Sequence, residues 1–113
     1  MKLSADDLWR LNHMLLAIAD IEECVKKRHL DPLIQYALEK LITNIGEMAR
    51  SVSPTLKQQY ADIPWPNIVA MRNMLVHEYH KIDKETVWDV AEHKIPALKD
   101  WIIGIIEAHE KTN

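Results

Sequence analysis

Apolar residues recur along this chain at the three- and four-residue spacing typical of helices. The clearest pattern has intervals of 4, 3, 4, 3 and 4 residues and consists of Ile34, Leu38, Leu41, Ile45, Met48 and Val52. It predicts a long amphipathic helix that begins with Asp31 as its N-cap and Pro32 as its first residue. Gly46 in its middle costs about 1 kcal/mol relative to Ala, which indicates a close crossing by another helix.

Three further helices follow from the same spacing. One spans about residues 5 to 27, and its predicted core positions are Leu8, Leu11, Leu15, Ile18 and Val25. A second begins near Pro66, after residues 51–62, which are predicted to form a loop with one short helical turn. The last begins after the N-cap Asp83 and runs to about residue 105, with a kink near residues 93–95 because Pro96 interrupts it. The tail from His109 is predicted to be frayed.

These elements predict an all-α fold, an antiparallel four-helix bundle with a short extra turn in the loop before the third long helix. The 113 residues form a single domain, and only two of them are glycine, which disfavours a turn-rich β fold. The single cysteine, Cys24, permits no intramolecular disulfide, and the N-terminus lacks the pattern of a signal peptide. We therefore expect a cytoplasmic protein, and the absence of a run of about 18 apolar residues predicts no membrane span.

The formal net charge of -3 is not typical of a protein that coats nucleic acid. A local positive field would still be available from Arg72, from Arg50 and from the cluster at residues 26–29, Lys-Lys-Arg-His. That cluster has a simpler explanation, because cations at the end of a helix complement its dipole.

The candidate chemistry lies in residues 71–79, on the helix that begins near Pro66. Arg72 and Tyr79 fall inside the apolar arc of this helix, where an unpaired guanidinium costs several kcal/mol. Arg72 therefore needs a partner, a wet cleft or a subunit interface. His77 lies about 140° round the helix from Arg72, so either the helix ends near His77 or a second copy of the chain brings the two groups together. Asn73 is spaced to orient the His77 ring.

Histidine and arginine are the residue types that metal-free RNA cleavage needs. The 2′-hydroxyl attacks the neighbouring phosphorus, which requires a base, an acid and positive charge on the phosphate. Histidine as a residue type exchanges protons near neutral pH, and the planar fork of arginine can bind two phosphate oxygens. Glu47 is either a local ion-pair partner of Arg50, three residues away, or a supporting residue of such a site.

The pattern R-x4-H-x-Y formed by Arg72, His77 and Tyr79 resembles the HEPN ribonucleases, in particular the HepT-like toxins of prokaryotic toxin–antitoxin pairs. The strings Ile-Gly-Glu at 45–47, Ile-Pro-Trp at 63–65 and Val-Trp at 87–88 are similar to that family as well. The resemblance implies a metal-independent endoribonuclease that uses no cofactor. In it, Arg72 and His77 of two protomers line the cleft of a homodimer, with Asn73 and Glu47 as supporting residues.

The resemblance also implies a partner, an MNT-type nucleotidyltransferase antitoxin that attaches AMP to Tyr79. The pair would form a type VII-like toxin–antitoxin system. Added nucleotides would place bulk and negative phosphate beside Arg72 and His77, where an RNA phosphate has to bind. The alternative interpretation of Tyr79 is a residue at the edge of the core with its hydroxyl in water.

Other functions are compatible with the same residues. The chain could be a non-catalytic helical module that holds a substrate or partner for a separate nucleotidyltransferase, or a structural dimerisation bundle with Arg72 at the interface. His77 and His80 do not form an H-E-x-x-H zinc motif, because position 81 is Lys, and no third ligand is evident. No sequence neighbour of Cys24 suggests an activated nucleophile.

Overall fold

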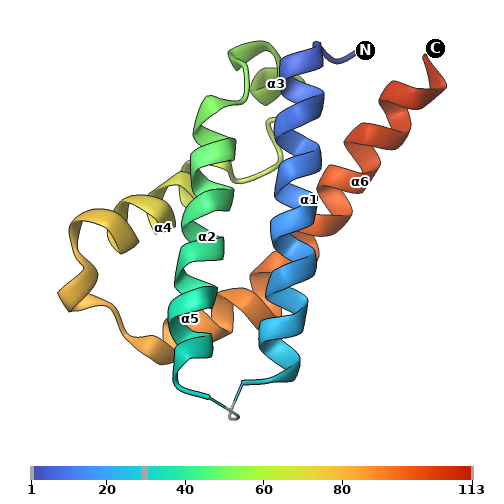
Figure 1. The fold of residues 1–113 in the computed structure, drawn as a ribbon. Helices are drawn as coiled ribbons and strands as arrows, with labels where there is room; N and C mark the ends of the chain where they lie inside the picture. Colours follow the sequence, from blue (N-terminus) through green and yellow to red (C-terminus); the bar gives the residue numbers. More distant parts are fainter. Residues whose placement is uncertain (1, 29–30, 113) are drawn as a thin grey trace.

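Four long helices and several short helical segments make up the computed structural model, which describes residues 2–28 and 31–112. Figure 1 shows their arrangement. In chain order the elements are α1 (Ala5–Lys26), α2 (Leu33–Ser51), α3 (Pro54–Gln59), α4 (Trp65–His77), the 3₁₀ turn η1 (Tyr79–Lys81), α5 (Lys84–Asp89), the π-helical turn η2 (Val90–Lys94) and α6 (Ile95–Lys111). The predicted all-α bundle is confirmed, and α3 is the predicted short turn before the helix that carries the motif.

Helix α2 is the centre of the fold. It packs along α1 on one side and against α4 on the other, while α6 packs against α1. In Figure 1, α1 and α2 run side by side and α4 leads away from α2. The fully buried side chains come mainly from α1, α2 and α6, and the largest are Leu11, Met14, Ile18, Ile21, Leu38, Ile45, Ile102 and Ile105.

The buried face of α2 is rotated from the predicted one. Leu38, Ile45 and Val52 are buried as expected, but Ile34, Leu41 and Met48 are only half-buried. The positions buried in their place include Ile42 and the small residues Gly46 and Ala49. Because α1 and α4 both contact α2, its buried surface is wider than a single apolar stripe and includes the small residues at the crossing. In α1, likewise, Met14 and Ile21 are buried, whereas Leu8, Leu15 and Val25 are half-buried.

The predicted boundaries are mostly confirmed. The Asp83 side chain accepts the Glu85 N–H at 3.0 Å, as expected of an N-cap. At the start of α2 the N-cap is Pro32 and not Asp31, a shift of one residue, although the Asp31 carboxylate still accepts the Leu33 N–H at 2.8 Å.

The interruption expected from Pro96 is the π turn η2, which begins at Val90, earlier than predicted. Pro96 itself lies in the first turn of α6, where its missing N–H costs little. The π turn therefore accommodates Pro96, and the helical segments follow one another without an intervening loop.

The prediction of a frayed C-terminal tail is wrong for the described part of the tail. Helix α6 continues to Lys111, and His109 is buried. The backbone N–H of Leu3 donates to Nδ1 of His109 at 2.9 Å, so this hydrogen bond links the segment before α1 to the last turns of α6. An isolated histidine near a terminus gave no sign of this contact in the sequence.

Of the basic cluster at residues 26–29, Arg28 is engaged within the fold, and His29 lies outside the described residues. The Arg28 guanidinium pairs with Glu85 and Glu92 and lies over the Trp88 ring, 4.9 Å from its centroid. These contacts, Glu85 foremost, raise the pKa of Arg28. Arg28 thus joins the end of α1 to α5 and η2 through ion pairs, a structural role that differs from the predicted complement to the helix dipole.

None of the helices in residues 2–28 and 31–112 is long and apolar enough to cross a membrane.

Candidate active site

The candidate site begins at the crossing of α2 and α4, where Gly46 meets Arg72. A Cβ placed on Gly46 would lie 2.2 Å from the Arg72 Cβ and 3.3 Å from its Cα. Real side chains do not approach so closely, so only glycine permits this distance between the helices. The close crossing predicted from Gly46 is confirmed, and the helix that crosses is the one that carries the motif.

The Arg72 guanidinium is held by two residues near this crossing. Its Nε and Nη2 both lie 2.5 Å from one carboxylate oxygen of Glu47, and its Nη1 donates to the Asn73 oxygen at 2.9 Å. The Arg72 side chain is only 13% exposed. The partner that its place in the apolar arc requires is therefore Glu47.

Two predicted contacts are replaced by this arrangement. Glu47 pairs with Arg72 across the helix crossing and not with Arg50, the local partner that was one of the two alternatives for it. The Asn73 oxygen accepts a hydrogen bond from Arg72, so it is not turned to the His77 ring as expected. Glu47 and Asn73 were both candidate supporting residues, and the structure shows that both contact the Arg72 guanidinium.

His77 is the last residue of α4, which agrees with one of the two alternatives that its spacing from Arg72 left open, and its side chain is exposed. The helix stops there because Glu78 leaves the helical conformation, with φ -129° and ψ 35°. His77 is thus at the open end of the helix, about a turn and a half beyond Arg72. The imidazole is accessible to an RNA strand or to a second copy of the chain.

Tyr79 belongs to the turn η1 and not to α4, and its side chain is 49% exposed. Glu39, a buried residue of α2, has a carboxylate that accepts a hydrogen bond from Gln35 Nε2 at 2.6 Å. Partial desolvation raises the pKa of Tyr79, and the nearby Glu39 carboxylate raises that pKa further.

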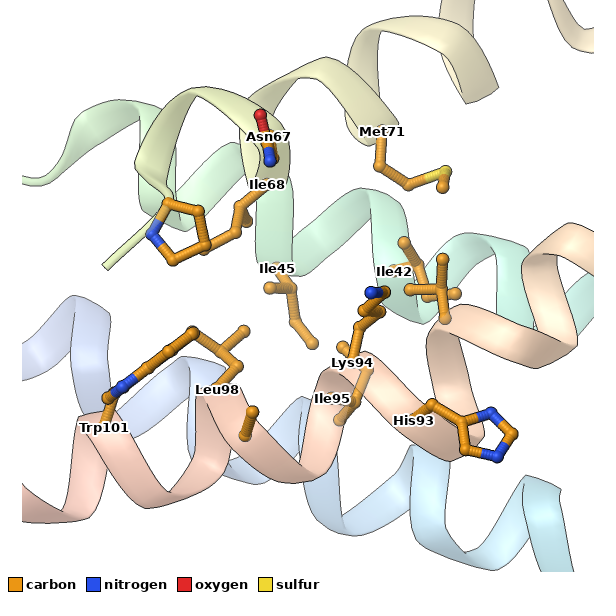
Figure 2. A pocket seen from close by; sticks show the side chains of 13 residues that line it. Ile42, Ile45, Asn67, Ile68, Met71, His93, Lys94, Ile95, Leu98 and Trp101 are labelled. Atoms are coloured by element: carbon orange, nitrogen blue, oxygen red, sulfur yellow. The ribbon is translucent and has the colours of Figure 1, made fainter. Parts of the chain in front are cut away.

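A hollow of about 470 Å³ lies on the other side of α4, between α4 and α6, with α2 as its floor (Figure 2). In Figure 2, Asn67, Ile68 and Met71 face Ile95, Leu98 and Trp101 across it. Most of the lining is apolar, and none of the three motif residues contributes to it. Arg72, which is largely buried, and His77, which is exposed, therefore both lie outside this hollow.

The described residues contain no group of three His, Cys, Asp or Glu side chains placed to hold a metal ion. Burial raises the pKa of the Cys24 thiol, and the charge of Asp20 raises it further. A thiol of this kind stays protonated and is a poor nucleophile.

Comparison with known proteins identifies relatives over most of the chain. The family described as "Ribonuclease HepT-like" matches residues 14–105. A Thermococcus cleftensis protein, named provisionally as ribonuclease HepT, is 31% identical over 88% of this chain and 93% of its own length. A Methanocaldococcus jannaschii protein, named provisionally as an RNase, is 30% identical over 81% of this chain and 76% of its own length.

Another Methanocaldococcus jannaschii protein is 33% identical over 89% of this chain, and its name combines a gamma-glutamylcyclotransferase with a provisional RNase. The present chain spans about half of that relative, 48% of its length. No solved structure matches the chain.

Proposed function

The chain belongs to the HepT-like ribonuclease family, and from that membership we propose that it is a metal-independent endoribonuclease, the toxin of a type VII-like toxin–antitoxin pair. It would act in the cytoplasm as a homodimer on RNA, with Arg72 and His77 as its catalytic residues. One observation carries this proposal. The Arg72 guanidinium, held by Glu47 and Asn73, lies on the same helix as the exposed His77.

Arg72 is suited to the phosphate. Its guanidinium has five N–H donors, of which Glu47 and Asn73 engage only some. The remaining donors can bind phosphate oxygens as negative charge accumulates on them in the transition state. Glu47 restricts the side chain to one position, so little motion is lost when the phosphate binds.

His77 is suited to the proton transfers. The 2′-oxygen of the RNA bonds to the adjacent phosphorus, and the bond from phosphorus to the 5′-oxygen breaks. One imidazole takes the proton from the 2′-hydroxyl, and another group supplies a proton to the departing 5′-oxygen. The products are a 2′,3′-cyclic phosphate and a free 5′-hydroxyl.

A second copy of the chain would supply the second set of groups. Arg72 is held against α2, whereas His77 projects from the open end of α4, so one chain offers them separately. A two-fold contact brings two arginines and two histidines into one groove. The apolar hollow beside α4 supports such a contact, since its exposed Trp101 and half-buried Met71 are surface that a partner would cover.

Tyr79 is the proposed acceptor of AMP from an MNT-type nucleotidyltransferase antitoxin. Its side chain is half-exposed and follows His77 by two residues, in the turn directly after α4. A nucleotide on its hydroxyl would put negative phosphate close to the histidine. RNA would then be excluded both by bulk and by like charge.

The chemistry is tested with a mixed RNA pool and a DNA pool of the same sequences, incubated with the unmodified protein in excess EDTA. We expect cleavage of RNA alone, with 2′,3′-cyclic phosphate and 5′-hydroxyl ends. Cleavage of DNA, a strict requirement for Mg²⁺, or 5′-phosphate ends would contradict the proposal. Inactivity with an intact mass that shows no AMP would favour the non-catalytic binding module.

A further inference from the structure

The outer face of α2 carries positive charge next to Arg72 that the proposed RNA chemistry does not use. Tyr36, Lys40, Glu47 and Arg50 follow one another along this face, because helix geometry places each of the other three within about 60° of Glu47 around the axis. The side chains of Tyr36, Lys40 and Arg50 are all exposed. They form a stripe along α2 that is open to solvent.

Arg72 joins this stripe from α4. Its guanidinium is paired with the Glu47 carboxylate, so its charge lies at the Glu47 position of the stripe. Along the axis of α2, Lys40 precedes Glu47 by about 10 Å and Arg50 follows it by about 4.5 Å. The residue that we propose for the reacting phosphate therefore has a cation on each side of it.

Lys40 and Arg50 have no acidic partner among residues 2–28 and 31–112. Acidic residues outnumber basic ones by 17 to 14 in the chain, so partners are not scarce. Glu47 lies three residues before Arg50, but Arg72 already engages it. The stripe thus keeps two unpaired positive charges, which attract an anion most strongly between them.

The helix dipole does not account for these two cations. A cation at the end of α2 is supplied by Lys57 of α3, whose Nζ donates to the Arg50 carbonyl oxygen at 3.2 Å. Lys40 lies in the interior of α2, away from both ends. The side chains of Lys40 and Arg50 are therefore available to a ligand.

Tyr36 indicates which form of RNA this ligand takes. It lies one helical turn before Lys40 and is 58% exposed. Proteins bind single-stranded nucleic acids with cations along the backbone and aromatic side chains on which bases stack. A duplex keeps its bases stacked on each other and offers none to a tyrosine.

We propose that the outer face of α2 binds single-stranded RNA, an inference that rests on the proposed ribonuclease function. The reacting phosphate lies at Arg72, Lys40 and Arg50 bind phosphates on either side of it, and a base stacks on Tyr36. The face extends over about 21 Å from Tyr36 to Arg50. These contacts hold the strand in place while Arg72 and His77 act on it.

The first test measures binding without cleavage. Fluorescence anisotropy follows a labelled single-stranded RNA whose 2′-hydroxyls are all methylated, so that the attack cannot occur. We expect Lys40→Gln/Arg50→Gln to bind roughly tenfold more weakly than the native chain, with a salt dependence shallower by about 1.4 in log–log slope, the value for two phosphate contacts. Lys84→Gln/Lys111→Gln removes the same charge from exposed positions on α5 and α6 and should bind as the native chain does. Equal affinities and slopes for the two double variants would overturn the inference.

The second test concerns the stacked base. Tyr36→Ala should weaken binding of the same RNA by roughly 5- to 100-fold with an unchanged salt slope, since stacking involves no counterion. Trp9→Ala removes an aromatic side chain of similar exposure, 54%, from α1 and should have no effect. The native chain should also bind the methylated single strand at least roughly tenfold more tightly than its duplex. Equal binding of strand and duplex would overturn the assignment to single-stranded RNA.

Cleavage assays separate this inference from the proposed function. In an active protein, Lys40→Gln/Arg50→Gln should raise KM for RNA, and a native KM in that variant overturns the binding face alone. A native chain that binds the methylated strand through this face but cuts no RNA overturns the ribonuclease proposal alone. Loss of a dimer in sedimentation by Lys40→Gln/Arg50→Gln, with native affinity for RNA, would assign the face to a second copy of the chain and overturn the inference.

Discussion

Gly46 and Arg72 approach so closely that the Arg72 Cβ occupies the space of any side chain at position 46, 2.2 Å from where a Cβ would stand. This contact sets the distance between α2 and α4. It therefore also sets the position from which Glu47 reaches the guanidinium. A change at Gly46 should affect both the stability of the bundle and the geometry of the site.

Gly46→Ala tests this relationship. Alanine favours a helix by about 1 kcal/mol over glycine, but the clash must push α4 away, and overpacking of this kind costs typically about 1–3 kcal/mol. We expect a net loss of stability in chemical denaturation together with reduced RNA cleavage. Gly104→Ala is the control, because nothing lies within 4 Å of its added Cβ, and it should be neutral or stabilising. A Gly46→Ala protein as stable and active as the native chain would contradict the close crossing.

Glu47→Gln tests whether the carboxylate positions Arg72. The amide removes the charge that holds Nε and Nη2, so the guanidinium loses its fixed orientation while the site becomes more positive. We expect kcat to fall by about 10- to 100-fold without a rise in KM for RNA. Glu22→Gln, which removes an exposed carboxylate paired with Lys99, is the matched control. A rise in KM at constant kcat would argue that Glu47 contributes to RNA binding alone.

Trp101→Glu tests the apolar hollow as the surface that a second copy covers. Trp101 lines the hollow and is 38% exposed, so a charge there should prevent association without unfolding the chain. We expect a monomer in analytical ultracentrifugation and a loss of RNA cleavage. Trp9→Glu makes the same change on α1, at a side chain 54% exposed and outside the hollow, and should remain dimeric. A dimeric, active Trp101→Glu protein would place the interface elsewhere.

Leu38→Ala and Leu41→Ala test the corrected core face of α2. Leu38 is fully buried, so its truncation should cost roughly 2–5 kcal/mol of unfolding free energy. Leu41 is half-buried, so Leu41→Ala should lower the unfolding free energy by clearly less than Leu38→Ala does. If chemical denaturation gave equal losses of unfolding free energy for the two variants, the buried face of α2 would be the one that the apolar spacing predicts.

The sequence predicts the number, type and approximate ends of the long helices because each has a repeated apolar spacing. It does not predict which of two neighbouring faces of α2 is buried, since that depends on α1 and α4 packing from different sides. The motif pattern alone is enough to name Arg72, His77 and Tyr79 as candidate site residues. The contact of Glu47 with Arg72 depends on a crossing between segments 25 residues apart, which helical spacing does not encode.

The most direct measurement of the central proposal is RNA cleavage in excess EDTA by the purified, unmodified chain beside the Arg72→Ala/His77→Ala double variant. Circular dichroism of both proteins shows whether the variant keeps its helices, as expected if the two residues serve chemistry. We predict that the native chain cuts the RNA pool and that the folded double variant does not. Equal cleavage by both proteins would contradict the assignment of the site to Arg72 and His77.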